Sequence, residues 1–423
     1  MYLTQSVCKL QSICLQNVCK LQGKAKFCFI VFLMYFSLNY IAIAQPLNFL
    51  ELNPQYKSYM KHAVLQNYME DSVLLKQLKH KWKRHKDLRI RVFGDSHVAS
   101  DFITNELRNI LGNTNSIGFT YPLMPPYHQN LLLTYQNNGF LVIDSRKPSD
   151  YSDYPMGGIV AYPEELPASI SLSINPNQLR SLNNKFIMQI VFKNSDTKQA
   201  LRIEDADLKS HILYASQQDK WDIESLKLKF PITIHALSEN VKLGGYFIYK
   251  EKDSNIIEHL GVNGVRSDIW KKWDKEILEK ELKVLDYDII MLCYGSNDAM
   301  YNVLKEDRFI ENYREFIAIL KENNPNAIII LVSPPPVLLP SDTSKRQYQI
   351  TNTFIPVKEA IAKIAKMEHI MLFDIDDFIE KNGAKNSWTN LNLSKRDVHL
   401  TPQGYKLVAH GIYHAIANAI KKQ

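Results

Sequence analysis

The residues of this chain that are equipped for chemistry stand in a few short clusters, the first of which is Gly94-Asp95-Ser96-His97. The cluster follows the run Arg-Ile-Arg-Val-Phe of residues 89–93, which favours a strand. A serine at the point where a strand ends and a helix begins can act as a nucleophile, because its hydroxyl stands clear of the sheet and backbone N–H groups lie beside it. Taken alone, the turn is equally consistent with a serine that caps a helix.

Three further clusters could complete such a site. Asn297, in the run Gly-Ser-Asn-Asp of residues 295–298, can aim its amide at a developing oxyanion, and Gly264 can offer a backbone N–H. His399 stands just before the last predicted helix and could deprotonate a serine, while Asp397 steadies its imidazole. Each of these clusters, taken alone, is more often a turn, a helix cap or a surface pair.

In their order along the chain, the four clusters together resemble the SGNH or GDSL-type hydrolase family. The resemblance implies that Ser96 is the nucleophile and His399 the general base. It also implies an oxyanion hole made of the Ser96 N–H, the Gly264 N–H and the Asn297 amide. The run Leu-Thr-Pro-Gln-Gly-Tyr of residues 400–405 is typical of the family as the start of its closing helix, and the resemblance covers about residues 85–115 and 260–423.

One position departs from the family pattern, because Arg396 stands where the family usually has an acid, three residues before the histidine. Asp397 is then the candidate that orients His399, and a backbone carbonyl is the alternative. Asp95 and His97 flank the nucleophile and are interpreted as its supports. No cofactor is expected, since no metal-ligand spacing is recognised among Asp95, His97, Asp374, Asp376 and Asp377.

Hydrophobic periodicity places these clusters in an α/β domain that carries an insertion. Apolar residues at helical spacing over residues 54–86 predict an N-terminal helical segment (45–87). The first part of the hydrolase domain (88–119) follows, with a strand at 88–93 and a helix at 98–111. Residues 120–255 then contain short extended runs at 131–135, 139–143, 169–174, 186–192, 211–215, 226–230 and 241–249, which predict an inserted β-sandwich. Long loops with hairpins are the alternative.

The second part of the hydrolase domain spans residues 256–423. Apolar strands at 285–294, 327–332 and 370–373 alternate with helices at 309–322, 347–367 and 403–421. Such strands separated by helices predict a parallel sheet covered on both faces. The clusters fall at the carboxyl ends of strands, where such sheets bind ligands. The fold class is therefore α/β, and the family resemblance implies a flavodoxin-like, three-layer sandwich.

The N-terminus predicts export. Residues 1–26 hold four lysines and no acid, and residues 27–44 are largely apolar and end in Ala-Ile-Ala. Residues 1–44 are therefore interpreted as a signal peptide that is cleaved before Gln45, which places the mature protein in the periplasm. An uncleaved membrane anchor is the alternative. The long, cysteine-bearing leader also suggests a later translation start, for instance at Met34 or upstream of it.

Removal of this leader takes away four lysines and no acid, so the net charge falls from +7 to +3. No nucleic-acid partner is expected, because no basic cluster is interleaved with aromatic residues on a recognisable module. The basic run of residues 79–86 is interpreted as the solvated end of a helix, with contact to an anionic envelope polymer as the alternative. Cys293, the single thiol outside the leader, lies in an apolar strand and should be buried.

A secreted enzyme with Gly-Asp-Ser-His and a β-domain between Ser96 and Gly264 resembles the peptidoglycan O-acetylesterases, whose insertion is similar to a carbohydrate-binding module. The resemblance implies removal of O-acetyl groups from the 6-hydroxyl of muramoyl residues, through an acetyl-serine intermediate. O-acetylated peptidoglycan is then the partner. An O-acetyltransferase, a lipase or thioesterase of the same fold, and a glycan-binding envelope protein with a vestigial pocket are the alternatives. No oligomeric state is predicted.

Overall fold

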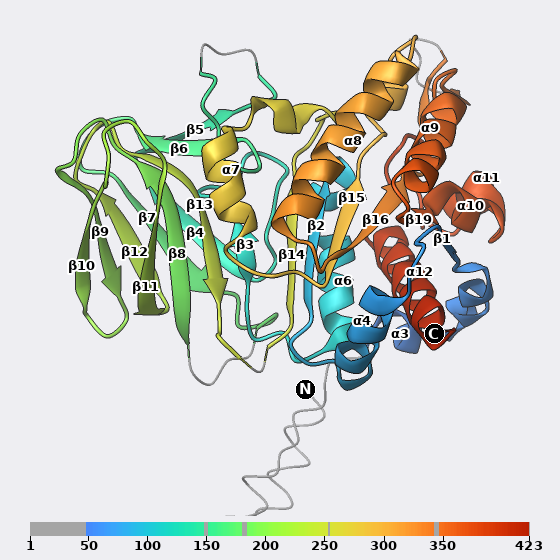
Figure 1. Cartoon of the computed structure of the whole chain (residues 1–423), viewed down its shortest axis with the longest axis horizontal. Coiled ribbons are helices and arrows are strands. Elements are labelled where there is room, and N and C mark those ends of the chain that lie inside the picture. Colours follow the sequence, from blue (N-terminus) through green and yellow to red (C-terminus); the bar gives the residue numbers. More distant parts are fainter. Residues whose placement is uncertain (1–47, 148–150, 180–183, 253, 342–346, 423) are drawn as a thin grey trace, which may run out of the picture. The chain divides into compact units, whose positions relative to one another are not determined.

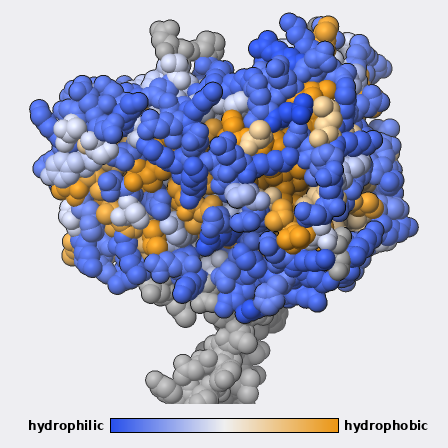
Figure 2. Space-filling view, viewed as in Figure 1, coloured by the Kyte–Doolittle hydropathy of each residue, from blue (hydrophilic) through white to orange (hydrophobic). Residues whose placement is uncertain are grey.

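A computed structural model describes residues 48–422 of the protein, except 148–150, 180–183, 253 and 342–346. The predicted signal peptide, its cleavage site before Gln45 and the alternative start at Met34 lie outside the described residues. Within these ranges, no helix is both long enough and apolar enough to cross a membrane. Hydrophilic side chains cover most of the face seen in Figure 2, with apolar ones in patches between them, which is the usual make-up of a folded protein's surface.

A six-stranded sheet carries the candidate residues (Figure 1). Its order is β1-β19-β16-β15-β2-β14, and every strand except β1 runs parallel to its neighbours. The parallel strands are β2 (Arg89–Gly94), β14 (Ile256–Gly261), β15 (Ile289–Cys293), β16 (Ile328–Ser333) and β19 (Met371–Asp374). Their side chains are largely apolar and buried, as the strands of a sheet covered on both faces should be. The predicted parallel sheet is confirmed.

Helices cover both faces of this sheet, so the α/β part has three layers. Helices α4 (Val73–Arg84), α6 (Phe102–Leu111) and α12 (Pro402–Lys421) pack on one face, while α7 (Lys275–Leu282), α8 (Glu306–Asn323) and α9 (Phe354–Met367) pack on the other. Strand β2 divides the two apolar cores, because its alternate side chains point to opposite faces. Ile90 and Val92 belong to the first core, and Phe93 meets Phe316 of α8 with ring centroids 5.4 Å apart.

The prediction of a helical segment over residues 54–86 is only partly right. The segment contains the 3-10 helix η1 (Pro54–His62) and helix α4, but strand β1 (Leu65–Asn67) interrupts them and helix α3 (Phe49–Leu52) precedes them. Because β1 pairs with the open edge of β19, tertiary pairing overrides the helical spacing. The basic run of residues 79–86 lies at the end of α4, where Trp82 is buried and stacks on Tyr413 at 5.2 Å.

Two predicted helices are shorter or more divided than expected. The helix predicted at residues 98–111 is split into α5 (Ser96–Ala99) and α6 by Asp101, which has a φ of 59°. The buried Asp101 carboxylate accepts hydrogen bonds from Arg108 at 2.6 Å and from the Leu131 N–H at 2.8 Å, and these contacts fix the break. The helix predicted at 347–367 begins only at Phe354, because β18 (Tyr348–Ile350) pairs with β17 (Leu338–Pro340).

The predicted β-sandwich insertion is also confirmed, and it lies to the left of the parallel sheet in Figure 1. One sheet has the order β10-β9-β12-β7-β4, and the other has the order β11-β8-β13-β6-β5, with β3 beside β13. Ile170 and Ile203 of the first sheet and Ile190 of the second belong to one buried core. Each of the seven predicted strands has a counterpart, and β3, β6, β9 and β12 are additional to them.

The strands of the insertion have the following bounds: β3 Gly118–Thr120, β4 Leu133–Asn138, β5 Phe140–Asp144, β6 Ile159–Pro163, β7 Ser169–Ile174, β8 Lys185–Lys193, β9 Gln199–Asp205, β10 Ser210–Tyr214, β11 Asp222–Lys229, β12 Ile232–Ala236 and β13 Lys242–Tyr249. All the pairings between them are antiparallel. This accounts for their alternation of apolar and polar residues.

Strand β14, which leads from the insertion back into the parallel sheet, escapes prediction because its middle residues, Glu258 and His259, are polar although both are buried. Glu258 accepts hydrogen bonds from Arg91 Nε at 2.5 Å, from the Tyr287 hydroxyl at 2.7 Å and from the Phe119 N–H at 2.6 Å. Because Phe119 belongs to β3, one buried carboxylate joins the insertion to β2 and β14.

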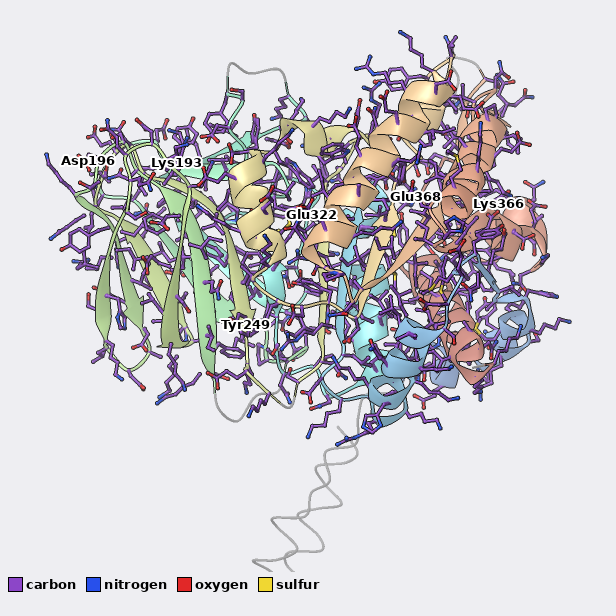
Figure 3. All side chains as sticks on the ribbon, viewed as in Figure 1. Lys193, Asp196, Tyr249, Glu322, Lys366 and Glu368 are labelled. Atoms are coloured by element: carbon purple, nitrogen blue, oxygen red, sulfur yellow. The ribbon has the colours of Figure 1, made fainter. Side chains whose placement is uncertain are left out.

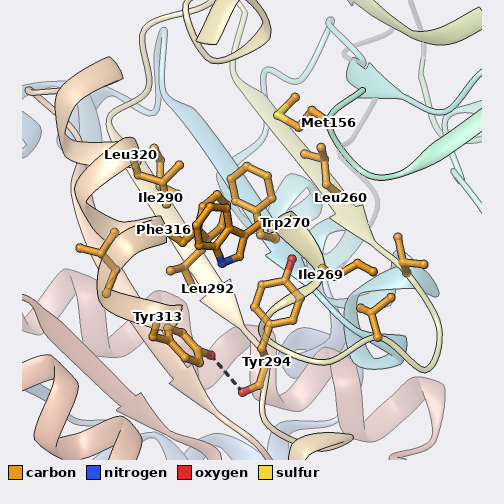
Figure 4. Close-up of a cluster of buried hydrophobic side chains, with 14 of the residues drawn as sticks. Met156, Leu260, Ile269, Trp270, Ile290, Leu292, Tyr294, Tyr313, Phe316 and Leu320 are labelled. Carbon is orange, nitrogen blue, oxygen red and sulfur yellow. Dashed lines mark hydrogen bonds between the residues drawn. The ribbon is translucent and has the colours of Figure 1, made fainter. Parts of the chain in front are cut away.

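An apolar cluster continues this junction, and Figure 4 shows part of it. Met156 of the insertion lies near Leu260 of β14, and Trp270, in the 3-10 helix η2 (Ile269–Lys272), stacks on Phe316 with centroids 5.5 Å apart. The dashed line in Figure 4 marks the hydrogen bond that the Tyr313 hydroxyl donates to the backbone carbonyl of Tyr294, directly after β15, at 3.4 Å. The insertion and the α/β part therefore share one core.

Contacts between α8 and α9 and two short helices complete the α/β part. Glu368, which is labelled in Figure 3, accepts hydrogen bonds from Arg314 at 2.6 Å and from Lys321 at 3.0 Å, and so ties α8 to the end of α9. The short helices α10 (Ile375–Glu380) and α11 (Ala384–Asn390) follow β19. Cys293 is buried in β15 as predicted, and burial raises the pKa of its thiol.

Glu281 of α7 offers a test of whether the shared core excludes water. Its side chain is fully buried and accepts the Met156 N–H at 2.7 Å, and burial raises its pKa from 4.5 to about 8. The folded state therefore holds this proton more tightly than the unfolded state, and the stability that depends on it falls as the pH rises from about 4.5 to about 8.

The substitution Glu281→Gln removes this titration and retains an acceptor for Met156. We expect the free energy of unfolding of the variant, relative to the wild type, to increase between about pH 5 and pH 8, by at most about 1.4 kcal/mol per pH unit. Urea unfolding at both pH values measures it, with the exposed neighbour Glu279→Gln as the control. Parallel pH dependence of wild type and Glu281→Gln would contradict the prediction.

Candidate active site

Ser96 is the first residue of α5 and follows β2 almost directly. Asp95 caps this short helix, since its carboxylate accepts the backbone N–H of His97 at 3.0 Å. Asp95 and His97 are buried, whereas Ser96 between them is partly exposed. The cap of this helix is therefore Asp95 and not Ser96, so the alternative of a serine cap is wrong, and the Ser96 hydroxyl takes no part in capping α5.

Two glycines allow α5 to lie directly on the sheet. A Cβ on Gly94 would stand 2.4 Å from Val98 Cγ2 and 2.7 Å from the Cys293 carbonyl oxygen. A Cβ on Gly261 would stand 2.2 Å from the Ala99 nitrogen. Neither position can accept a side chain without displacing backbone, so these glycines fix the height of the Ser96 turn above β2 and β14.

A chain of hydrogen bonds joins Ser96 to His399 and Asp397. The Ser96 Oγ lies 3.2 Å from His399 Nε2, and the other ring nitrogen, Nδ1, lies 3.2 Å from Asp397 Oδ2. The second carboxylate oxygen of Asp397 accepts the His399 backbone N–H at 2.9 Å. A serine, a base in contact with its hydroxyl and an acid that orients the base form the arrangement that activates a serine for attack on an acyl group.

The Asp397 carboxylate contacts the ring of His399, although Arg396 occupies the usual position of the acid. Arg396 is exposed, while the backbone carbonyl of Asp397 accepts a hydrogen bond from the buried Lys385 at 2.6 Å. Burial alone would raise the Asp397 pKa, but the hydrogen bonds from His399 outweigh it and lower the pKa to about 2. A carboxylate that stays ionised can stabilise a protonated His399. Of the two alternatives, the carboxylate and not a backbone carbonyl contacts the ring.

His97 lies behind the pair of Ser96 and His399. Its Nδ1 is 2.9 Å from the Tyr405 hydroxyl of α12, and its ring centroid is 5.7 Å from that of His399. Burial lowers the pKa of His97 to about 3, so its ring is neutral at physiological pH. Burial also raises the pKa of Asp95 to about 7. Both residues lie where a support of the nucleophile turn should lie.

The two other predicted oxyanion donors stand on the loops that follow β14 and β15, the neighbours of β2. Gly264 is exposed with a φ of 77°, a conformation that favours glycine, and in the described part of the chain its N–H donates no hydrogen bond. Asn297 Nδ2 donates to the Val265 carbonyl at 2.9 Å, which orients the amide and leaves its second N–H available. Ser96, Gly264 and Asn297 thus share one edge of the sheet.

Asp298 joins the loop that carries Asn297 to the loop that carries Gly264. Its carboxylate accepts hydrogen bonds from the backbone N–H and the hydroxyl of Ser267 at 3.1 and 2.9 Å. The side chain is buried, and burial raises its pKa to about 6. Because Asn297 precedes Asp298 and Gly264 lies three residues before Ser267, this contact couples the positions of both donors.

Two residues of the insertion hold the Gly264 loop, and nothing in the sequence points to them. Arg146 Nη1 donates to the Asn263 carbonyl at 2.7 Å, and His128 Nε2 accepts the Asn263 N–H at 3.1 Å. Arg146 is itself held by Asp144 at 2.6 Å. These contacts span 117 and 135 residues along the chain, so no local spacing could reveal them. The insertion is thus part of the scaffold of the site.

Two family comparisons agree with this geometry. Residues 245–407 match the GDSL-like lipase/acylhydrolase family, and residues 116–233 match the N-terminal domain of peptidoglycan O-acetylesterases. The first range covers most of the second part of the α/β domain, with Gly264, Asn297 and His399, and the second range covers most of the insertion; Ser96 lies outside both. They confirm the resemblance to SGNH-type ester hydrolases that the four clusters indicate.

Structural and curated relatives are distant in sequence. A solved peptidoglycan O-acetylesterase superposes with a TM-score of 0.73 over 85% of this chain and 99% of its own, at 20% identity, which shows a shared fold. A family two carbohydrate esterase from Cellvibrio japonicus covers 69% of this chain and 99% of its own at 11% identity, but its TM-score of 0.27 supports no argument. An N-acylneuraminate cytidylyltransferase from Escherichia coli O18:K1:H7 (strain RS218) is 21% identical over 68% of this chain, which spans 60% of that relative's length.

The role of Asp397 can be tested by substitution. Asp397→Asn keeps the size of the side chain but removes the charge that faces His399, so kcat for 4-nitrophenyl acetate should fall by at least about 10²-fold. Arg396→Ala, next to it and exposed, is the control and should stay near wild type. A nearly unchanged Asp397→Asn beside an inactive His399→Ala would show that Ser96 and His399 act as a dyad.

The role of the insertion in the site can be tested at Arg146. Arg146→Ala removes the hydrogen bond to Asn263 and releases the Gly264 loop, so we expect kcat for 4-nitrophenyl acetate to fall about tenfold with KM little changed. Arg202→Ala, a partly exposed residue of β9 that pairs with Glu204, is the control. An equal loss of kcat in both variants, or none in Arg146→Ala, would contradict this role.

Proposed function

We propose that this chain, which combines a GDSL-like acylhydrolase domain with the N-terminal domain of peptidoglycan O-acetylesterases, is a serine esterase that removes O-acetyl groups from cell-wall peptidoglycan. The observation that carries the proposal is the hydrogen-bonded chain from Ser96 through His399 to Asp397. A glycan-binding protein with a vestigial pocket has no need of such a chain. The geometry therefore favours an enzyme.

The reaction follows from the geometry. His399 Nε2 takes the hydroxyl proton of Ser96 as its Oγ attacks the acetyl carbonyl carbon. The N–H groups of Ser96 and Gly264 and the Asn297 amide stabilise the resulting oxyanion. The bond between the acetyl carbon and the sugar oxygen then breaks, and His399 gives the proton to that oxygen. The sugar departs as an alcohol, and the acetyl group remains on Ser96. His399 next deprotonates a water molecule that attacks this ester, and acetate and free Ser96 result.

Peptidoglycan is proposed as the substrate because the insertion matches the N-terminal domain of enzymes that act on it. Within peptidoglycan, we propose the acetyl ester on the 6-hydroxyl of muramoyl residues, as the family resemblance implies. The insertion would bind carbohydrate, in the manner of the modules that it resembles. Its contact with the Gly264 loop through Arg146 supports a role close to the scissile ester.

We further propose a periplasmic location. The support is the leader of residues 1–44, with its lysines, apolar stretch and Ala-Ile-Ala end, together with a substrate that lies outside the cytoplasmic membrane.

An O-acetyltransferase would share every residue of this site, and it differs only in the acceptor that attacks acetyl-Ser96. Release of acetate in the absence of a sugar acceptor distinguishes the esterase from the transferase.

Acetate release from O-acetylated peptidoglycan tests the function. Wild type should release acetate, and Ser96→Ala should lose this activity because it lacks the attacking oxygen. Asn297→Ala should lower kcat by roughly 10²–10³, the cost of one lost oxyanion donor. Full acetate release by Ser96→Ala would contradict the assignment of the nucleophile, and a cell-wall preparation that the wild type leaves acetylated would contradict the substrate.

A further inference from the structure

A cavity of about 300 Å³ lies beside the oxyanion loops. Its walls come from the Gly264 loop, the Asn297 loop and the start of α8, and they include Arg266, Asp298, Tyr301, Lys305, Arg308 and Phe309. Arg266 follows Gly264 by two residues and Asp298 directly follows Asn297, so the cavity is within one or two residues of both proposed donors. A group bound there would belong to the same substrate molecule as the reacting ester.

Cations outnumber acids in the walls of this cavity by three to two. Lys305 and Arg308 are exposed and form no ion pair among the described residues, while Arg266 pairs with Asp268 at 2.9 Å. The buried Asp298 carboxylate is engaged by the backbone N–H and the hydroxyl of Ser267. Two cations are therefore left without a protein partner.

The acids of the first turn of α8 do not cancel this charge. Glu306 pairs with Lys363 at 3.0 Å, and Asp307 lines a separate cavity on the side of α8 that holds Arg314 and Lys363. Positive charge at the entrance of a concave site attracts anions and holds carboxylates through charge-assisted hydrogen bonds. The free pair of Lys305 and Arg308 thus points to an anionic ligand.

The same cavity has an apolar part. Tyr301 is 57% exposed, and the Arg266 guanidinium lies over the Tyr301 ring, 5.2 Å from the ring centroid. Val303 is 75% exposed, and Phe309 is buried beneath. A ligand that suits these walls carries a carboxylate next to an aliphatic group. Hydrolysis of a neutral acetyl ester needs neither feature, so the cavity would recognise another part of the substrate.

We propose that this cavity is a subsite for a carboxylate of the acetylated glycan. The proposal rests on the proposed function, because the glycan of peptidoglycan carries such groups close to the acetylated sugar. Two sources share this chemistry: the lactyl carboxylate on the sugar itself, and the carboxylates of an attached peptide. The subsite makes the enzyme select acetyl esters that lie beside an anionic substituent.

The test is the double substitution Lys305→Gln/Arg308→Gln in the full chain, with three substrates. These are O-acetylated muropeptides, the same glycan after the peptide is removed to expose the lactyl carboxylate, and neutral 4-nitrophenyl acetate. We expect KM to rise at least about tenfold for the glycan whose carboxylate the cavity binds, the effect of one lost charge-assisted hydrogen bond, and kcat/KM for 4-nitrophenyl acetate to change less than about twofold. Lys198→Gln/Arg202→Gln, two exposed cations of the insertion, is the charge-matched control.

The substrates separate the outcomes. A rise in KM on the muropeptides alone supports the peptide carboxylates as the ligand. A rise on the peptide-free glycan alone supports the lactyl carboxylate, which is bound in an amide in the muropeptides, and a rise on both supports a subsite that accepts either group. An unchanged KM on both acetylated glycans, where the wild type hydrolyses them, overturns the subsite and leaves the proposed function intact. An equal loss on 4-nitrophenyl acetate also overturns it, because the cations would then support the oxyanion loops. A wild type that releases no acetate from either glycan overturns the proposed function itself, and the subsite with it.

Discussion

The close contact between α5 and the two strands beneath it is the constraint on which the rest of the site depends. Because Gly94 and Gly261 lack a Cβ, α5 lies directly against β2 and β14, and Ser96 stands where both strands end. The loop of Gly264 leaves β14 at the same edge, and the loop of Asn297 leaves β15 there. His399 reaches this edge on the segment before α12, which Thr401 anchors by capping the helix. A small shift of α5 would therefore separate the nucleophile from its base and from its donors together.

The insertion belongs to the machinery of the site as much as the parallel sheet does. Arg146 and His128 hold the loop that carries Gly264, and Glu258 joins the start of the insertion to β2 through Arg91. Because Arg91 and Glu258 are fully buried, the loss of either would leave an unpaired charge in the core. The long interval between Ser96 and Gly264 is thus filled by a domain that positions the proposed oxyanion donor.

Much of the fold follows from the sequence, because its signals are local. Apolar runs between helices predict β15, β16 and β19, and the order of the four clusters predicts Ser96, Gly264, Asn297 and His399 as site residues. The predictions fail where distant contacts decide the structure. β1 forms because the edge of β19 is open, β14 is hidden by buried polar residues, and α5 and α6 separate where Asp101 meets Arg108. Arg146 and His128 give no signal at all, since they contact the site only after the insertion has folded.

We infer that Ser96 is acylated and that the resulting ester is then hydrolysed. Mass spectrometry of the protein, quenched in acid during turnover of an O-acetylated glycan, tests it most directly. We expect one acetyl group per chain, carried by the peptide that contains Ser96, and we expect it to disappear when the substrate is exhausted. Steady acetate release with no acetyl group on Ser96, or with the acetyl group on another residue, would contradict it.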